Sequence, residues 1–266
     1  MPRLAWATDL HLNFLSEKEL ESFGDSLARC EADVLLVGGD TSEAYTLDFH
    51  LAFLAKRFPG PVWFVLGNHD FYRGSILKVR RAADALKARL PSLRWLQSSG
   101  VVSLSPATAL VGCDGFGDAR CGDPERSSVV LNDFMLIDEL TSITQAQRLA
   151  RLGRLGDDDA EHLRSVLPPA LEKHEQVVVL THVPPFPEAA WHQGKRSGPD
   201  WLPYFCCAAA GTALREAALS FPKREILVLC GHTHSGGEAQ ILPNLKVLTG
   251  GAVYGQPRID RVLSLE

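Results

Sequence analysis

The sequence predicts an α/β fold in which helices connect the strands of a parallel β-sheet. Over its first third, short runs rich in valine and leucine alternate with stretches whose apolar residues recur every three or four positions. This alternation is typical of β-α-β units, whose right-handed crossovers build parallel sheets. The 266 residues, 45% hydrophobic and 22% charged, are also enough for a globular protein with a sizeable core.

The individual elements follow from the same periodicity. Short apolar runs predict strands over residues 4–7, 34–37, 62–66, 108–111, 177–180, 226–229 and 246–248. A capping box from Ser16 to Glu19 predicts a helix that begins there and reaches about Cys30. Apolar residues spaced three and four apart predict two further helices, over residues 47–57 and 76–90. The first third therefore reads β-α-β-α-β-α.

The middle of the chain departs from this alternation. Residues 93–111 hold short strands separated by proline and serine turns. Residues 141–174 form a charged helical stretch that we expect to break near Gly153 and Gly156. The three aspartates at 157–159 could bind a metal. They are better explained as a solvated helix N-terminus, where acidic side chains complement the helix dipole.

The proline-rich segment 184–204 is predicted to be a loop. Such a segment could form a lid that sets specificity. Because no repeat or linker interrupts the chain, we expect residues 1–266 to form a single domain that includes this segment.

Charge and cysteine content restrict the functional classes. The net charge of −5, from 27 basic and 32 acidic residues, gives no general attraction to nucleic acid or to an anionic membrane. The six cysteines form no C-x-x-C pair, the N-terminus has no signal-peptide pattern, and the apolar runs are too short for a membrane span. We therefore expect a cytoplasmic protein with no membrane partner.

Polar residues with metal-binding chemistry follow five of the predicted strands. Five of the nine histidines lie at these positions, together with aspartates and one asparagine. In open α/β sheets, ligands bind at the carboxyl edge of the strands. Aspartate, asparagine and neutral imidazole are suitable ligands for divalent transition metals. Each short motif is weak by itself, but their joint occurrence predicts a metal site at this edge of the sheet. The polar residues at these strand ends are Asp9, His11, Asp40, Asn68, His69, Asp70, His182, His232 and His234.

The order of these motifs resembles that of the calcineurin-like metallophosphoesterase superfamily. The series D-x-H, G-D, G-N-H-D, a single histidine and G-H-x-H runs from residue 9 to residue 234. The 29 residues from His11 to Asp40 and the 28 from Asp40 to Asn68 each leave room for one helical crossover. The resemblance implies a four-layer αββα sandwich, in which helices flank two mixed β-sheets.

The resemblance also implies a binuclear centre of two divalent ions, such as manganese, iron or zinc. It assigns one ion to Asp9, His11 and His234 and the other to Asn68, His182 and His232, with Asp40 bridging both. Ions about 3.5–4 Å apart can clamp the attacking and leaving oxygens of a phosphoryl transfer, and the nucleophile is then a metal-bridging hydroxide.

Further site residues are assigned around these ligands. By resemblance, His69 faces the substrate, where it stabilises phosphate charge or protonates the leaving oxygen. Glu43 takes the position of an acid that orients this histidine in many relatives, although its side chain is longer. Asp70 is an alternative orienting group, or else supports the loop. Substrate-binding candidates are Asp118 and Arg120, which could equally pair with each other, and His192 in segment 184–204.

The predicted function is metal-dependent hydrolysis of a phosphate monoester or diester, as a phosphatase or phosphodiesterase. A nuclease acting on DNA or RNA is an alternative, supported by a basic rim of Arg73, Lys78, Arg80 and Arg81 but disfavoured by the acidic chain. A metal-bearing scaffold without catalysis is a second alternative, disfavoured because a scaffold has no need of His69. We predict no protein partner.

Overall fold

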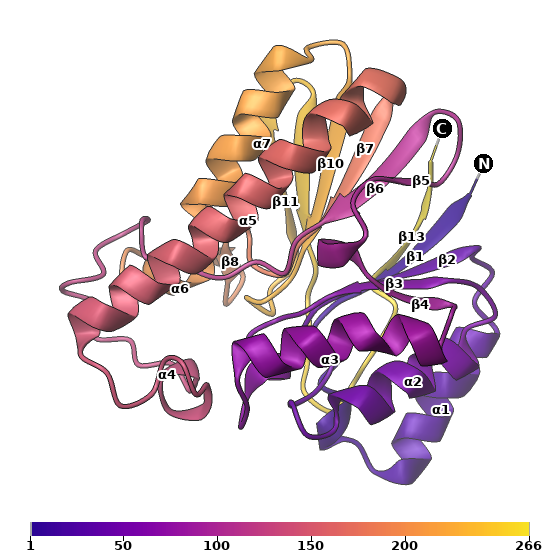
Figure 1. The fold of residues 1–266 in the computed structure, drawn as a ribbon, viewed down its shortest axis with the longest axis horizontal. Helices are drawn as coiled ribbons and strands as arrows, with labels where there is room; N and C mark the ends of the chain where they lie inside the picture. The colour runs from indigo at the N-terminus through magenta and orange to yellow at the C-terminus, as the bar shows by residue number, and fades with distance from the viewer. Residues whose placement is uncertain (1, 266) are drawn as a thin grey trace.

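The structure, a computed structural model that describes residues 2–265, is a sandwich of two mixed β-sheets with helices on both outer faces (Figure 1). The first sheet has five strands in the order β13-β1-β2-β3-β4. The second has six strands in the order β11-β12-β10-β7-β6-β5. The four-layer arrangement implied by the motif order is therefore confirmed.

The first sheet contains the β-α-β units predicted for the first third of the chain. Its strands are β1 (Arg3–Ala7), β2 (Val34–Gly38), β3 (Val62–Val65), β4 (Leu93–Trp95) and β13 (Arg261–Ser264). The first four are parallel, and β13 pairs antiparallel with β1. The connecting helices are α1 (Glu17–Ala28), α2 (Leu47–Arg57) and α3 (Ile76–Arg89). The Ser16–Glu19 capping box begins α1 as expected.

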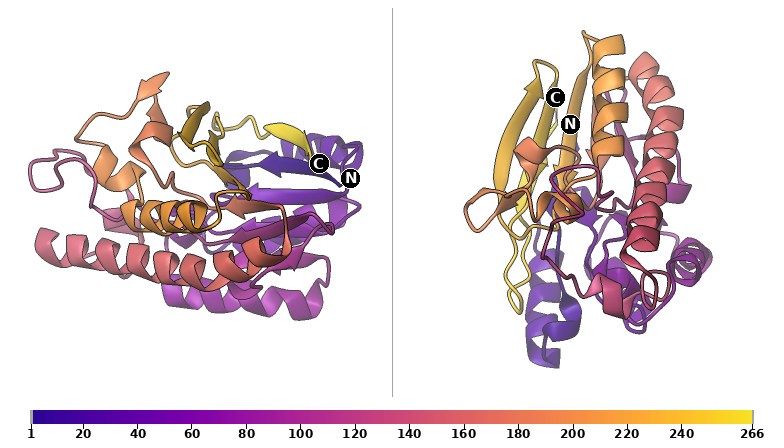
Figure 2. Two further views of the ribbon diagram at one scale, coloured as in Figure 1. Left: turned by 90° about the horizontal axis from the view of Figure 1, so that it is seen from above. Right: turned by 90° about the vertical axis from the view of Figure 1, so that its left-hand side faces the viewer.

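The second sheet is covered by two long helices. Its strands are β5 (Val102–Ser103), β6 (Thr108–Gly112), β7 (Gln176–Leu180), β10 (Glu225–Cys230), β11 (Gly237–Leu242) and β12 (Leu245–Thr249). Helices α5 (Gln145–Lys173) and α7 (Ala208–Ser220) lie side by side along its outer face (Figure 2). The antiparallel edge strands β11 and β13 were not predicted, because they carry few buried side chains and lack a clear apolar run.

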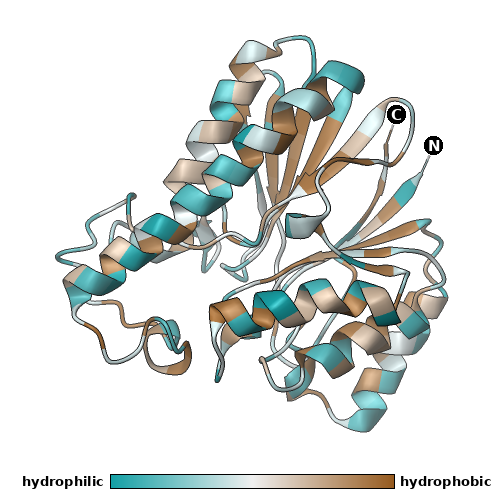
Figure 3. Ribbon diagram, viewed as in Figure 1, coloured by the Kyte–Doolittle hydropathy of each residue, from teal (hydrophilic) through white to brown (hydrophobic). Residues whose placement is uncertain are grey.

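Three apolar layers separate the four layers of secondary structure. Alternate residues of β1 point to opposite faces: Leu4 and Trp6 pack between the two sheets, whereas Ala5 and Ala7 face the helices of the first sheet. A third cluster joins the second sheet to α5 and α7. Hydrophobic colour accordingly concentrates on the strands, and hydrophilic colour on the outer helix surfaces (Figure 3). Among residues 2–265, no helix combines the length and apolar character needed to cross a bilayer.

The predicted break in the long helix is wrong, because α5 runs unbroken for 29 residues. Gly156 serves close packing instead, because a Cβ there would lie 2.5 Å from the Cβ of Asp118. The aspartates at 157–159 consequently lie within the helix rather than at its N-terminus. Asp159 is fully buried, whereas Asp157 forms an ion pair with Arg120.

Segment 184–204 is more ordered than a loop. It contains a 3₁₀ turn (Pro187–Ala189) and the hairpin of β8 (Trp191–His192) and β9 (Lys195–Arg196), and it leads into α6 (Leu202–Phe205). The Thr249 hydroxyl donates to the Ala189 carbonyl at 2.7 Å, which ties the segment to β12. A short helix, α4 (Asp133–Leu136), lies in the connection that precedes α5. Movement of segment 184–204 as a lid stays a prediction.

Candidate metal centre

The carboxyl ends of five parallel strands meet at one edge of the sandwich. Strands β1, β2 and β3 are neighbours in the first sheet, and β7 and β10 are neighbours in the second. All seven predicted metal ligands follow these strands within four residues and come together across the two sheets. Their order after β1, β2, β3, β7 and β10 is Asp9 and His11, Asp40, Asn68, His182, and His232 and His234.

The backbone at most of these ligands is strained. Five of them have positive φ angles between 44° and 70°, namely Asp9, His11, Asp40, His232 and His234. For a residue other than glycine, this left-handed conformation costs on the order of 1–3 kcal/mol. Such strain persists only where the surrounding structure enforces it, and it concentrates at functional sites. The repeated strain therefore marks these strand ends as a built site rather than ordinary turns.

The first group of converging side chains comprises Asp9, His11, Asp40 and His234, whose ligand atoms all lie within 4.8 Å of one another. Nε2 of His11 faces Nε2 of His234 at 3.0 Å, and Nε2 of His234 lies 3.4 Å from Oδ1 of Asp9. The Thr8 hydroxyl and the His232 amide both donate to the Asp9 carboxylate. Asp9 is thus held with its oxygens toward the two imidazoles.

The second group comprises Asp40, His182 and His232, with ligand atoms inside the same 4.8 Å limit. Oδ1 of Asn68 joins it, at 3.1 Å from Nε2 of His182 and 3.0 Å from Nδ1 of His232. Asp40 belongs to both groups. Its carboxylate therefore occupies the position that a ligand shared by two ions would need.

The outward ring nitrogens of the second group indicate that a cation fits there. Nδ1 of His182 donates to the Gly38 carbonyl at 2.9 Å, and Nε2 of His232 donates to the Tyr204 carbonyl at 3.1 Å. A carbonyl oxygen can only accept, so in the neutral form of each ring the other nitrogen carries a lone pair. These two nitrogens face each other at 3.2 Å. A bound cation would satisfy both lone pairs, and backbone carbonyls commonly orient metal-bound histidines in this way.

The charges of the centre also favour bound cations. Burial opposes ionisation of Asp9, but the nearby histidines lower its pKa to about 2. The same balance keeps the pKa of Asp40 well below its usual range. Burial lowers the pKa of His11 to about 4 and that of His232 to about 3, so both rings are neutral. Burial also opposes protonation of His182 and His234, but Asp40 raises the pKa of His182 to about 10 and Asp9 raises that of His234, so a bound cation would displace protons from these two rings. Carboxylates and deprotonated imidazoles are the donor set that transition metals prefer.

Two glycines let the ligand loops approach one another. A Cβ at Gly67 would collide with the Asp40 carboxylate, and a Cβ at Gly231 would collide with Asp9 and Thr8. The glycines that precede the asparagine and histidine ligands are therefore required by packing. Neither residue has a φ angle in the left-handed region, so the requirement is one of space.

A buried carboxylate from α4 orients the Asn68 side chain. Oδ1 of Asp133 accepts from Nδ2 of Asn68 at 2.8 Å and from the Tyr72 hydroxyl at 2.6 Å. Burial is the main reason that the pKa of Asp133 is raised. Because a carboxylate oxygen accepts these bonds, the Asn68 amide nitrogen must face Asp133, and its oxygen must face the histidines.

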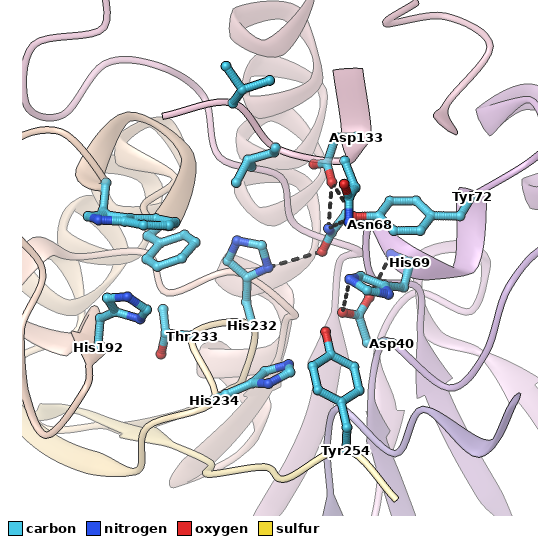
Figure 4. Close-up of a pocket in the computed structure, with 15 residues that line it drawn as sticks. Asp40, Asn68, His69, Tyr72, Asp133, His192, His232, Thr233, His234 and Tyr254 are labelled. Carbon is cyan, nitrogen blue, oxygen red and sulfur yellow. Dashed lines mark hydrogen bonds and ion pairs between the residues drawn. The ribbon is translucent and has the colours of Figure 1, made fainter. Parts of the chain in front are cut away.

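His69 faces a pocket beside the two groups. Its ring stacks on Tyr72 with centroids 4.1 Å apart, and its Nε2 lies 4.0 Å from Oδ2 of Asp40. The pocket has a volume of about 360 Å³, and His192 and Tyr254 also line it. Figure 4 shows His192 on one side of the pocket, His69 and Tyr254 on the other, and His232 between them.

The two acids proposed to assist His69 lie elsewhere. The Glu43 carboxylate accepts from Nε of Arg73 at 2.8 Å, and among residues 2–265 it forms no hydrogen bond or ion pair with His69. Asp70 is fully buried and accepts from the amides of Gly67 and Ser42, both at 2.9 Å. Asp70 therefore braces the loops that carry Asp40 and Asn68. The structure gives neither acid a direct contact with the His69 ring.

Of the three substrate-binding candidates, only His192 lines the pocket. Asp118 is buried, and its Oδ2 accepts from the Ala209 amide at 2.9 Å. Arg120 forms ion pairs with Asp118 at 3.2 Å and with Asp157 at 2.8 Å. Two carboxylates thus engage the guanidinium and hold its loop against α5. This agrees with the alternative that Asp118 and Arg120 pair with each other.

Several pocket residues were missed by the sequence analysis. Tyr254 follows β12, the neighbour of β10, so its place after a strand was a signal in the sequence. Trp201, Phe205 and Asp133 had no such signal, because Trp201 reaches the pocket from segment 184–204 and the other two reach it from the short helices α6 and α4. Their positions depend on tertiary packing alone.

Comparison with known proteins is consistent with this architecture. The family model described as calcineurin-like phosphoesterase matches residues 2–236. A search of curated proteins gave no match.

Three solved structures share the fold at low sequence identity. The phosphopantetheinyl hydrolase of Mycobacterium tuberculosis is 16% identical with a TM-score of 0.63, over 96% of this chain and 90% of that chain. A dimetal phosphatase from Danio rerio is 19% identical with a TM-score of 0.61, over 97% of this chain and 90% of that chain. GAP50, the anchor in the inner membrane complex of Plasmodium, is 12% identical with a TM-score of 0.51, over 99% of this chain and 77% of that chain.

Proposed function

The chain belongs to the calcineurin-like phosphoesterase family, and we propose that it hydrolyses phosphate monoesters or diesters at a centre of two divalent metal ions. The observation that carries this proposal is the sharing of Asp40 between two groups of ligands. One group supplies Asp9, His11 and His234, and the other supplies Asn68, His182 and His232. The proposal includes that the ions are manganese, iron, zinc or a similar metal and that the protein is cytoplasmic.

The ligand residues have distinct tasks in this proposal. When bound, two divalent ions lower the pKa of a water molecule and neutralise charge on phosphate oxygens. The strained strand ends hold the ligands in place before any ion arrives, so binding requires little rearrangement of the backbone. Asp133 keeps the Asn68 oxygen toward the centre, and the backbone carbonyls of Gly38 and Tyr204 keep the rings of His182 and His232 in the ligand tautomer.

His69 is the group proposed to act on the ester itself. Its Nε2 points toward the centre without being among the converging ligand atoms. From there it can donate a hydrogen bond to a phosphate oxygen or a proton to the leaving oxygen. General acid catalysis of this kind contributes typically about 10²–10⁴-fold to turnover.

Charge at the site favours small esters over nucleic acids. Two members of the basic rim are engaged in ion pairs, Arg73 with Glu43 and Arg80 with Asp114. Binding of nucleic acid depends on free lysines and arginines that contact phosphates.

The position of His69 in the pocket supports catalysis over the alternative of a metal-bearing scaffold without activity.

The proposal is tested with purified protein and added manganese on p-nitrophenyl phosphate and on its bis ester. We expect hydrolysis that chelation abolishes. His69→Ala should retain both ions and lose about 10²–10⁴-fold in turnover, whereas Asp40→Ala should lose the ions. Metal-loaded protein that is inactive across a broad panel of monoesters and diesters would contradict the proposal, as would an Asp40→Ala variant that still binds two ions.

A further inference from the structure

We infer that the pocket beside the metal centre selects phosphate esters whose organic group carries a flat aromatic or heteroaromatic ring and no second phosphate. This inference rests on the proposed hydrolysis and adds the substrate class. It follows from the wall of the pocket, its lack of basic side chains and its size.

One wall of the pocket is a cluster of three rings. The rings of His192 and Trp201 lie 4.7 Å apart between centroids, and those of Trp201 and Phe205 lie 4.9 Å apart. Phe205 in turn meets the ring of His232, edge to face at 5.0 Å. The aromatic wall therefore begins directly beside a predicted metal ligand. An ester whose phosphate is at the centre would bring its organic group against these rings.

The wall is part of the folded framework. Phe205 is 7% exposed, and the Tyr204 carbonyl beside it accepts from Nε2 of His232. Trp201 begins the turn of α6, where its carbonyl accepts from the amides of Tyr204 and Phe205. Rings held in this way offer a preformed stacking surface, so little entropy is lost when a second flat ring binds.

The described lining of the pocket offers no lysine or arginine for a second anionic group. None of the described residues that line it is a lysine or an arginine, whereas Asp40 and Asp133 do line it. The cations of the adjacent hairpin, Lys195 and Arg196, are exposed and lie outside the lining. A phosphate beyond the one at the metal centre would find no lysine or arginine in this lining to neutralise it.

The remaining polar groups suit a ring that can form hydrogen bonds. In residues 2–265 the imidazole of His192 makes ring contacts but no hydrogen bond, so its nitrogens are available to a ligand. A volume of about 360 Å³ is at the lower end of the range for small-molecule sites. One flat ring system, such as a nucleobase, joined to a phosphate through a short linker or a sugar matches that size.

A pair of substrates isolates the contribution of the ring. Adenosine 5′-monophosphate and ribose 5-phosphate have the same type of leaving alcohol and differ in the presence of the base. We expect a higher kcat/KM for the nucleotide, carried mainly by a lower KM. Because stacking of a base on an aromatic side chain is worth about 1–3 kcal/mol, the preference should be roughly 5- to 150-fold.

Substitutions at the wall test whether the rings cause this preference. Trp201→Leu, which keeps an apolar side chain but removes the ring, should abolish most of it, and Trp201→Phe should retain most of it. Phe205→Leu should reduce it, whereas the same change at the exposed Phe49 of α2 should leave it intact. Equal kcat/KM values for the two substrates, or a preference unchanged in Trp201→Leu, would overturn the inference.

Binding of adenosine separates this inference from the proposed hydrolysis. Adenosine has no phosphate, so its affinity, measured by isothermal titration calorimetry, is independent of turnover and can be compared between variants that lack Trp201. We expect binding that Trp201→Leu weakens and Trp201→Phe preserves. Protein that binds adenosine in this way without hydrolysing any ester would support the pocket and refute the proposed function. Protein that hydrolyses esters but neither binds adenosine nor prefers the nucleotide would refute the pocket alone.

Discussion

Truncation of Asp133 should weaken one of the two metal sites. Asp133→Ala removes the acceptor that holds the Asn68 amide at 2.8 Å and the Tyr72 hydroxyl at 2.6 Å. Without this acceptor the Asn68 side chain can rotate, so its oxygen is no longer held toward His182 and His232. The ion assigned to Asn68, His182 and His232 should therefore lose affinity, while the ion assigned to Asp9, His11 and His234 keeps it.

The size of the effect follows from the lost hydrogen bond. A buried hydrogen bond to a charged group contributes about 1.5–3 kcal/mol. Expressed in affinity, this is roughly 10- to 100-fold, the range typical for loss of a group that orients a metal ligand. Asp133→Asn keeps a neutral acceptor of the same shape, so its loss should be smaller than that of Asp133→Ala.

Metal affinity is measured by competition with a chromophoric chelator, and stoichiometry by elemental analysis. Asp138→Ala is the matched control, because Asp138 lies five positions further along the same segment and is exposed. Thermal unfolding shows whether each variant is folded. If Asp133→Ala binds both ions with wild-type affinity, the orienting role assigned to Asp133 is refuted.

Two further predictions concern charged groups away from the ligands. Arg120→Met should leave KM for p-nitrophenyl phosphate unchanged and lower stability by about 1–3 kcal/mol, because the exposed pair with Asp157 contributes little but the buried Asp118 carboxylate loses a hydrogen-bond donor; a large rise in KM would instead indicate a substrate contact. Burial raises the pKa of Asp159 from 3.8 to about 7, so the folded protein binds this proton more tightly than the unfolded chain. The free energy of unfolding should therefore fall as pH rises from about 4 to about 7, by up to about 4 kcal/mol. Urea unfolding of Asp159→Asn should lack this component, and parallel pH profiles of variant and wild type would contradict it.

Local patterns in the sequence were sufficient for much of the fold. The Ser16–Glu19 capping box and the spacing of apolar residues predicted α1, α2 and α3 because they act within one or two turns. The break expected in α5 failed for a tertiary reason. Gly156 was interpreted as a helix breaker, but its missing side chain makes room for Asp118 from a distant loop.

The candidate metal ligands were also accessible from the sequence. Parallel strands bring their carboxyl ends to one edge, so residues that follow them must meet, whatever their separation along the chain. This reasoning needs only strand order and residue type. It therefore placed all seven candidate ligands at one edge, including Asp9 and His232, which lie 223 positions apart.

The sequence by itself thus determined the layered α/β fold and the chemistry of the strand ends, because both depend on local periodicity and on the direction of parallel strands. The tertiary structure decided which charged groups are free. Glu43 pairs with Arg73 and Arg120 with Asp118, whereas Asp133, Trp201 and Phe205 surround the pocket. These outcomes depend on contacts between irregular segments, whose conformation is set by what they pack against. No short-range pattern encodes such contacts.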